Sequence, residues 1–399
     1  MRSRARTALL VAGGALITGV TSAGPSSPEP PWTWATATSS PSPVAVAALT
    51  DREAQLEAAC GVGEAGLRKV AKQLVDRKIA DRPYLDLDGL TFAQRAAGEP
   101  HVWPRAWIVS GLALDHATTL SRIEAWRKSF HDLGERRCGV AIGYAPDGTE
   151  VVAAVALDAL GDLAPLPVRA RTGAWLTVDA TLRVPATGAR VLLLGPSGEP
   201  RSVPTSFEHG RVHARFATDR PGEFTVQVMA EVDTGPRPVL EARVFADVEP
   251  TTSLPNLTAP GEDAGGTGDA PTQLTNMIGK MREDARLPAL ARDPGLDALA
   301  LTHARLMVKT RTVGHDLGDG DPAERLRDAG MSAREAGENV AHAPSVKLAH
   351  RTLYASPSHR ANLVNGGFDR LGIAVIGDPD GSVWVTEVFA SRLRHGAGP

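Results

Sequence analysis

The chain predicts an α+β protein that is divided into several domains. Helical periodicity followed by a pair of strands occurs twice, once near each end, and a stretch of short alternating strands lies between the two. Helices followed by antiparallel strands are typical of α+β layers. The length of 399 residues fits roughly two or three domains, each large enough for its own core.

Composition excludes some classes of partner. The formal net charge is −3 and no block of like charges occurs, so nothing favours electrostatic binding of nucleic acid or of an anionic membrane. Aromatic residues make up only 5%, whereas there are 40 glycines and 30 prolines. This balance favours a loop-rich secreted protein over one large compact enzyme.

The N-terminus predicts a secretory signal peptide over residues 1–23. Arg2, Arg4 and Arg6 precede an apolar run at 8–20, and small residues follow it. The run is too short to span a bilayer comfortably, although an uncleaved anchor remains the alternative. We therefore expect a secreted, extracellular or periplasmic protein without a stable membrane span.

Two segments are expected to be linkers. Residues 24–48 are rich in Pro, Ser, Thr and Ala and show no apolar period, which predicts a disordered linker. Residues 250–271 are rich in Gly, Pro and Thr and predict a second linker.

The first domain is expected over residues 49–160. Apolar residues recur at helical spacing early in this stretch, and two strand-like runs flank a Pro-Asp-Gly turn near its end. The expected elements are helices at 67–75 and 118–133 and strands at 138–143 and 150–157.

Cys60 and Cys138 are the only cysteines of the chain. An even count in an exported protein predicts one disulfide, and two buried thiols are the alternative. A disulfide across so long a loop stabilises by roughly 4 kcal/mol on the chain-entropy argument.

The middle segment, residues 161–249, predicts a small antiparallel β-sandwich. Apolar and polar residues alternate in short runs, and Gly or Pro turns separate them. His209 and His213 lie in this segment and are expected on its surface, because no other site-like residue accompanies them. The expected strands are 176–182, 191–194, 212–216, 224–228 and 240–245.

The last domain is expected over residues 272–393. Asp293-Pro294 is a helix start signal, and the following apolar residues recur at i, i+3, i+4 and i+7. The expected elements are helices at 274–286, 294–307, 322–329 and 345–354, followed by two strands around the turn at 379–381.

The first and last domains share a pattern. Residues 67–75 align with 296–304, and Arg137-Cys138-Gly139 aligns with Arg370-Leu371-Gly372. The first domain has no counterpart of Gly337-Glu338-Asn339 and no Ser-Pro-x-His run. We interpret it as a degenerate copy that kept its packing and lost a polar site. Chance similarity between two helix-then-hairpin segments is the alternative.

His315, Glu338 and His359 are the candidate site. Each lies at the end of an expected element or beside Gly or Pro, and Gly337 is expected to turn the chain and present the carboxylate. If the three converge, they could bind a divalent metal with His315 and His359 as imidazole ligands. A hydrogen-bonded His–Glu–His cluster without metal is the alternative. Glu338 is the candidate catalytic carboxylate.

Two further polar features have simpler interpretations. His303 lies on the apolar face of its helix, where a hydrogen-bonded core or groove-lining histidine is favoured over a ligand. Asp316, Asp319 and Asp321 lack the terminal Glu of a calcium loop and are expected to form a solvated acidic loop. The chain contains no nucleophile elbow, P-loop or dinucleotide fingerprint in a suitable context.

These motifs carry a resemblance to a known family. Residues 337–340 match a Gly-Glu-Asn-aliphatic motif, and residues 356–363 match Ser-Pro-Gly-His-Arg-x-Asn-Ile with Ser358 in place of Gly. Gly314-His315 and the helix around His303 fit two further signatures. The last domain thus resembles the CAP superfamily of cysteine-rich secretory, antigen 5 and pathogenesis-related proteins, in its bacterial SCP-like form.

The resemblance implies a fold and a cavity. The fold would be an α-β-α sandwich, and the cavity would be lined by His315, Glu338 and His359, with Glu387 as a looser match. Zinc, seen in some family cavities, would be the divalent metal. Leu353 stands where a Trp is usual, which puts the shape of the groove in doubt.

Three functions follow from these expectations. The first is a secreted binding module that presents the His/Glu-lined groove to a lipid, a peptide or an envelope polymer. The second is a metal-assisted, protease-like hydrolase that uses His315, Glu338 and His359. The third is a structural envelope protein in which the cluster only packs. A shared fold does not choose among them.

Overall fold

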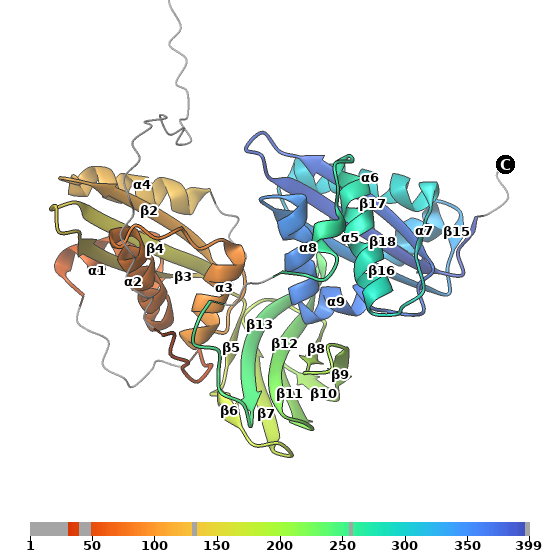
Figure 1. Ribbon diagram of the computed structural model, residues 1–399, viewed down its shortest axis with the longest axis horizontal. Coiled ribbons are helices and arrows are strands. Elements are labelled where there is room, and N and C mark those ends of the chain that lie inside the picture. Colours follow the sequence, from red (N-terminus) through yellow and green to blue (C-terminus); the bar gives the residue numbers. More distant parts are fainter. Residues whose placement is uncertain (1–30, 40–48, 130–133, 255–257, 396–399) are drawn as a thin grey trace, which may run out of the picture. The chain divides into compact units, whose positions relative to one another are not determined.

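The computed structural model describes residues 31–39, 49–129, 134–254 and 258–395 (Figure 1). The expected signal peptide at 1–23 lies outside these residues. Helices and several separate sheets make this an α+β protein. No helix in the described part of the chain is long and apolar enough to cross a membrane.

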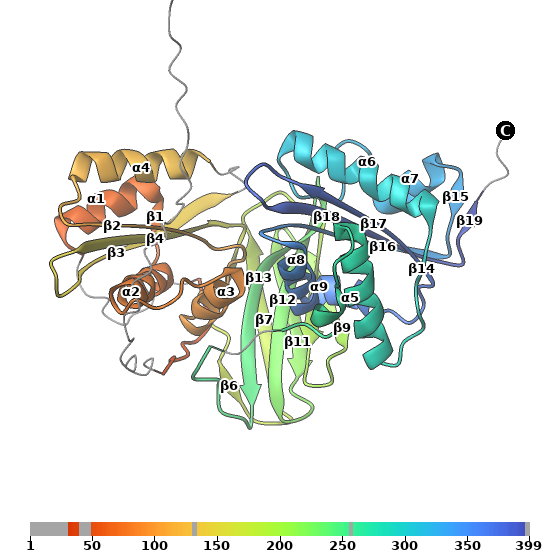
Figure 2. The same ribbon diagram turned by 45° about the horizontal axis from the view of Figure 1, so that its top comes forward.

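The first sheet is covered by helices on both faces (Figure 2). Its strand order is β1-β3-β4-β2, with β1 parallel to β3 and the other pairs antiparallel. The strands are β1 (Val62–Gly63), β2 (Arg105–Gly111), β3 (Glu135–Tyr144) and β4 (Glu150–Ala159). The helices are α1 (Asp51–Cys60) and α4 (His116–Lys128) on one face, and α2 (Ala65–Ile79) and α3 (Leu87–Ala96) on the other.

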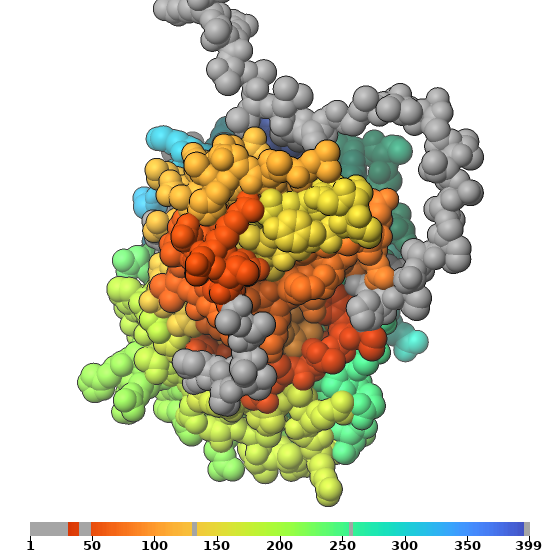
Figure 3. All heavy atoms as spheres, turned by 90° about the vertical axis from the view of Figure 1, so that its left-hand side faces the viewer, coloured from red at the N-terminus to blue at the C-terminus, as the bar shows by residue number. Residues whose placement is uncertain are grey.

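Strand β4 explains why the sheet needs two helical layers. Its residues are apolar on both sides and almost all buried, so each face must be covered. Val151 and Val155 face α2 and α3, whereas Val152 and Ala154 face α1 and α4. In Figure 3 the yellow atoms of the β3–β4 hairpin reach the surface between the helices α1 and α4.

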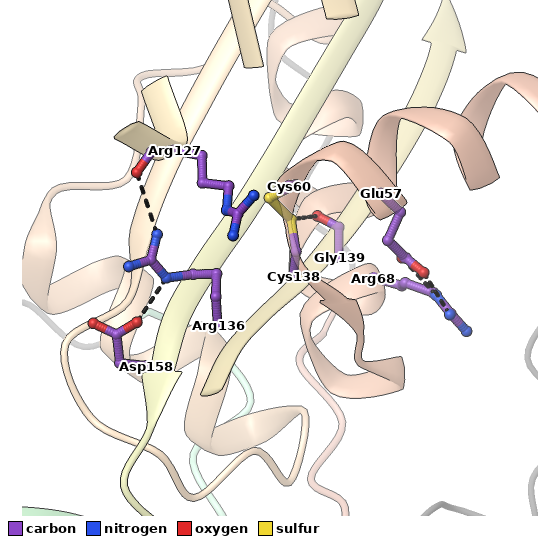
Figure 4. The surroundings of a disulfide bond; sticks show 8 residues. All are labelled: Glu57, Cys60, Arg68, Arg127, Arg136, Cys138, Gly139 and Asp158. Atoms are coloured by element: carbon purple, nitrogen blue, oxygen red, sulfur yellow. Dashed lines mark hydrogen bonds and ion pairs between the residues drawn. A yellow bond between two sulfur atoms is a disulfide. The ribbon is translucent and has the colours of Figure 1, made fainter. Parts of the chain in front are cut away.

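The predicted disulfide between Cys60 and Cys138 is confirmed (Figure 4). It joins the end of α1 to β3 and closes a loop with a sequence separation of 78 residues. Both cysteines are buried in the core between the sheet, α1 and α4. The buried Arg136 beside Cys138 donates to Asp158 over 2.6 Å.

Part of the first expected linker is folded. Trp32 and Trp34 both pack edge-on against Phe92, and Trp32 is only 5% exposed. Burial of these large aromatic side chains offsets part of the entropy cost of ordering this short segment. The prediction of a disordered linker is therefore wrong for residues 31–39.

The middle segment forms a sandwich of two sheets with the orders β10-β11-β7-β5 and β6-β13-β12-β8-β9. Alternating residues of both sheets form one apolar core. The longest strands, β12 (Gly222–Val232) and β13 (Gly235–Ala246), form a hairpin in which Val232 pairs with Gly235. The others are β5 (Gly161–Leu163), β6 (Arg169–Ala170), β7 (Trp175–Leu182), β8 (Gly188–Leu194), β9 (Pro200–Val203), β10 (Thr205–Glu208) and β11 (Arg211–Ala217).

The C-terminal sheet has the order β14-β17-β18-β16 and is again covered on both faces. A short pair, β15 (Met331–Ser332) and β19 (Arg394–His395), stands apart from it. The sheet strands are β14 (Ala291–Arg292), β16 (Glu335–Ala343), β17 (Arg370–Gly377) and β18 (Val383–Ser391). The helices are α6 (Pro294–Thr310) and α7 (Pro322–Asp328) on one face, and α5 (Ala270–Asp284), α8 (Val346–Ala355) and α9 (Pro357–Leu363) on the other.

The second expected linker also packs onto a domain. It contains a short 3-10 helix, η1 (Glu262–Ala264), and Glu262 accepts hydrogen bonds from Arg351 of α8. Gly261 approaches α5 so closely that a Cβ there would lie 2.2 Å from the Met277 carbonyl oxygen. At least residues 259–264 therefore belong to the C-terminal domain, and a free linker over 250–271 is wrong for them.

The first and last sheets have matching construction. In each, a two-residue strand pairs in parallel with the first strand of the terminal hairpin: Val62 with Arg137, and Ala291 with Arg370. In each sheet, a glycine of that hairpin lies against the helix that follows the two-residue strand in the chain. A Cβ on Gly139 would lie 2.1 Å from the main chain of α2, and a Cβ on Gly372 would lie 2.2 Å from the main chain of α6.

Candidate functional site

Strand β16 positions the Gly-Glu-Asn motif at the edge of the C-terminal sheet. Successive side chains of a strand point to opposite faces, so Glu338 and Asn339 enter different layers. Gly337 does not turn the chain, contrary to our expectation, because it lies within the strand. It is required for space, since a Cβ there would lie 2.7 Å from the side-chain oxygen of Asn362.

Glu338 is held by two cationic or donor groups on the α6–α7 face. His315 Nδ1 lies 2.9 Å from Glu338 Oε1, and the Arg325 guanidinium donates to Oε2. The Glu338 side chain is 0% exposed. Arg325 also donates to the main-chain carbonyl of His315 over 2.7 Å, which fixes the loop that carries the imidazole. A buried carboxylate needs such partners, because desolvation alone would disfavour its charge.

His303 lies beside this group as a fully engaged histidine. Its Nε2 donates to the Gly314 carbonyl over 2.8 Å, and its Nδ1 lies 2.7 Å from Asp319 Oδ2. Although burial acts in the opposite direction, hydrogen bonds from His303 and from the Leu317 amide lower the pKa of Asp319. Both ring nitrogens of His303 therefore have a hydrogen-bond partner. It supports the Gly314-His315 loop.

The acidic loop has a structural explanation. Asp316 accepts from the main-chain amides of Gly318 and Gly320, and Asp321 caps the first turn of α7. These roles fix the loop locally and leave Asp319 to bind His303.

The other face of β16 carries an amide network. Asn339 Nδ2 donates to Glu387 Oε2 over 2.9 Å and to the His359 carbonyl over 3.2 Å. Asn362 Nδ2 donates to Asn339 Oδ1 over 2.9 Å and to the main chain of Glu338. This network ties the helix α9, which carries His359, to the strand that carries Glu338.

Glu387 lies within this network on β18 and is 0% exposed. Burial raises the pKa of its carboxyl to about 7, and the hydrogen bond from Asn339 offsets only part of this. Its Oε1 atom is buried without a hydrogen-bond partner. A carboxyl in this setting is largely protonated below neutral pH.

His359 is a neutral imidazole with an unused nitrogen. Burial, and to a smaller extent the electrostatic interaction with His315, lower the pKa of His359 to about 3. Its Nδ1 atom is buried and has no hydrogen-bond partner.

The arrangement does not fit a zinc ion. Both oxygens of Glu338 already have a partner, one in Arg325 and one in His315. His303 also uses both nitrogens. Among the described residues, no group of three or more His, Cys, Asp or Glu side chains could hold a metal ion. A metal ion at Glu338 would compete with Arg325 for the charge of the carboxylate, and the two residues form a buried ion pair.

The residues expected at the site thus fall into two connected groups. Glu338 contacts His315 directly and lies 3.9 Å from His303, whereas His359 and Glu387 are joined through Asn339. Sequence reasoning missed Arg325 and assigned Asp319 only to a solvated loop, because neither has a motif that reports its partner in the folded chain. Asn339 and Asn362 were visible as letters of the two motifs, but their hydrogen-bonding role was not.

Comparison with known proteins gives the family. Residues 275–389 match CAP, described as the cysteine-rich secretory protein family. The C-terminal domain is a CAP domain. The match covers the helices α6 to α9 and the strands that position Glu338, His359 and Glu387, so these residues belong to the CAP domain itself. A search of curated proteins finds no match to the chain.

Several solved structures are similar to parts of the chain. An outer surface protein from Borrelia burgdorferi is 23% identical, with 32% of this chain and 95% of that chain covered and a TM-score of 0.30. An extracellular protein with an SCP domain from Bacillus anthracis is 16% identical, with 59% and 86% covered and a TM-score of 0.29. A cysteine-rich secretory protein from Staphylococcus aureus is 13% identical, with 58% and 84% covered and a TM-score of 0.27.

Proposed function

We propose that the protein is a secreted binding module whose CAP domain presents the site around His315, Glu338 and His359 to a lipid, a peptide or an envelope polymer. The observation that carries the proposal is the buried, unpartnered Nδ1 of the neutral His359. An unsatisfied buried polar atom costs free energy, and a ligand that hydrogen-bonds to it recovers that cost. Secretion rests on the signal-like segment at residues 1–23.

A hydrolase receives less support from the same geometry. A general base works best with a pKa near the working pH, whereas that of His359 is about 3. Glu338 is enclosed, and its oxygens are paired with Arg325 and His315, so it is poorly placed to activate a water molecule. His359 and Glu338 are therefore better suited to lining a binding site than to transferring protons.

We infer that residues 49–160 are a degenerate copy of the CAP domain. The support is positional, because Gly139 pairs with Val155 as Gly372 pairs with Val388. Val155 then pairs with Ala106, at the place where Val388 pairs with Glu338.

Two further positions follow from the same registers. Trp107 pairs with Ala154 where Asn339 pairs with Glu387. The polar pair of the CAP domain is thus an apolar pair in the first domain. Among the described residues of the first domain, no helix lies at the place of α9.

Binding to three classes of ligand tests the proposal. The immobilised full-length protein would be exposed to phospholipid vesicles, to a peptide library and to purified cell-wall polymer. We expect one class to bind wild type and the His213→Ala control, and to be lost with His359→Ala. Equal retention of that class by His359→Ala would refute the proposed site. Absence of binding by wild type to all three classes would refute the binding module.

A further inference from the structure

The tip of the β12–β13 hairpin contacts the loop that carries His315. The main-chain amides of His315 and Asp316 both donate to the Thr234 carbonyl, over 2.7 and 3.2 Å. These contacts join the central sandwich to the CAP domain through the main chain. They lie next to the imidazole that binds Glu338.

Glycines on both sides allow this close approach. A Cβ on Gly235 would lie 2.7 Å from the His315 Cβ, and a Cβ on Gly314 would lie 3.1 Å from the Thr234 Cβ. Real Cβ atoms do not come as close as the first of these distances, so a side chain at Gly235 would force the two loops apart. Gly235 has a φ of 90°, which also favours glycine there.

The same hairpin holds the start of the helix that carries His359. The buried Gln227 on β12 accepts a hydrogen bond from the Ser358 amide over 3.0 Å and donates to Ser356 Oγ over 3.2 Å. Ser356 is the N-cap of α9 but makes no capping hydrogen bond with its own side chain. Gln227 therefore satisfies an amide that helix caps normally satisfy.

We propose that the β12–β13 hairpin is an intramolecular strap that holds the His315 loop and the His359 helix of the CAP domain in place. One hairpin fixes the His315 loop through Thr234 and the His359 helix through Gln227, so it bridges the two segments that carry these imidazoles. The proposal goes beyond the proposed function, because the strap is present without any ligand.

The test disrupts the strap by mutation. It then measures hydrogen exchange and histidine modification in the His315 loop and in the His359 helix. Gly235→Ala introduces the Cβ that collides with His315. Gly173→Ala is the matched control, because Gly173 is a sandwich turn glycine with a φ of 84° and nothing within 4 Å of its would-be Cβ. Gln227→Leu removes the contacts with α9 while keeping a side chain of similar size.

Two readouts need no ligand. In Gly235→Ala we expect hydrogen exchange at the His315 and Asp316 amides to accelerate about tenfold or more, and diethyl pyrocarbonate to modify His315 faster. In Gln227→Leu we expect faster exchange at Ser358 and faster modification of His359. Gly173→Ala should match wild type in both readouts.

Unchanged exchange and modification in both Gly235→Ala and Gln227→Leu would overturn the proposal. Equal acceleration in Gly173→Ala would also overturn it, because strain in the sandwich would then explain the effect. Since neither readout involves binding, these outcomes are independent of whether a ligand for the CAP site is found.

Discussion

Single side chains decide what the CAP site can do. His359 has a ring nitrogen, Nδ1, that is buried without a hydrogen-bond partner. Both carboxylate oxygens of Glu338, in contrast, have a partner, one in His315 and one in Arg325. The chemistry of the site therefore differs from that expected of three convergent metal ligands. His315, Glu338 and His359 could be found from the sequence because short motifs contain them. Arg325 could not, since its role depends on how α7 packs.

Glu387 predicts an unusual dependence of stability on pH. Its folded-state pKa of about 7 lies above the ordinary value of 4.5, so the folded protein holds this proton more tightly than the unfolded chain. The contribution is therefore fully present below about pH 4.5 and is lost as the pH rises toward 7. The loss amounts to about 3 kcal/mol.

The variant Glu387→Gln removes this titration and can still accept the hydrogen bond from Asn339. Relative to Glu387→Gln, wild type should lose stability between pH 4.5 and 7, as measured by urea unfolding at several pH values. Parallel pH profiles of the two proteins would contradict the assignment.

Removal of Arg325 should be strongly destabilising. Arg325→Met leaves the Glu338 carboxylate buried without its cation, which costs about 3–5 kcal/mol in comparable buried pairs. The double variant Arg325→Met/Glu338→Gln should recover part of that loss, because no bare charge remains. Chemical denaturation of the full-length protein measures both.

An exposed ion pair provides the control for that experiment. Lys72 and Asp76 are both more than half exposed, so Lys72→Met should change stability by less than about 1 kcal/mol. A loss of similar size in Lys72→Met and Arg325→Met would mean that Arg325 is no more than a surface cation.

At the level of elements, sequence periodicity predicted the long helices and the terminal strands. It did not predict the edge strands β2 and β16. In the chain, β2 follows α3 and β16 comes after α7. β16 combines Gly, Glu, Asn and His, so it lacks an apolar alternation and its strand state depends on pairing with β18. The polar residues that make β16 hard to recognise are the ones that build the site.

The two helix-facing glycines should respond alike. Gly139→Ala and Gly372→Ala place a Cβ 2.1 and 2.2 Å from helix main chain, so each should cost about 1–3 kcal/mol through forced separation of helix and sheet. Gly377→Ala is the control, because nothing lies within 4 Å of that position. Thermal unfolding of the three variants measures the effect, and a neutral Gly139→Ala would contradict the matched construction.

At the scale of the whole molecule, the sequence located three folded regions but not their contacts. Alternating apolar and polar residues, and apolar residues at helical spacing, indicate which side chains enter the core of each region. The docking of Trp32, Glu262 and Gln227 onto other elements depends on three-dimensional proximity, which leaves no periodic signal. For this reason both linkers were predicted to include residues that pack onto a folded region.

The disulfide should stabilise one region selectively. Cys60→Ser/Cys138→Ser removes the disulfide, which joins two residues with a sequence separation of 78. The free energy of unfolding should fall by roughly 4 kcal/mol. Because this loop lies within the first domain, hydrogen exchange should accelerate in β3 and β4 and remain unchanged in β17 and β18. Acceleration of equal size in both sheets would show that the domains unfold as one unit.

The protonation of His359 tests the central claim most directly, since a binding site built around a neutral imidazole requires it. The measurement is an NMR pH titration of the histidine rings in the full-length protein, with His359→Ala to assign the signal. The account predicts that His359 stays neutral from pH 8 down to about 4, far below the usual midpoint near 6.5. A midpoint between about 6 and 7 would contradict it and return His359 to the candidates for general base.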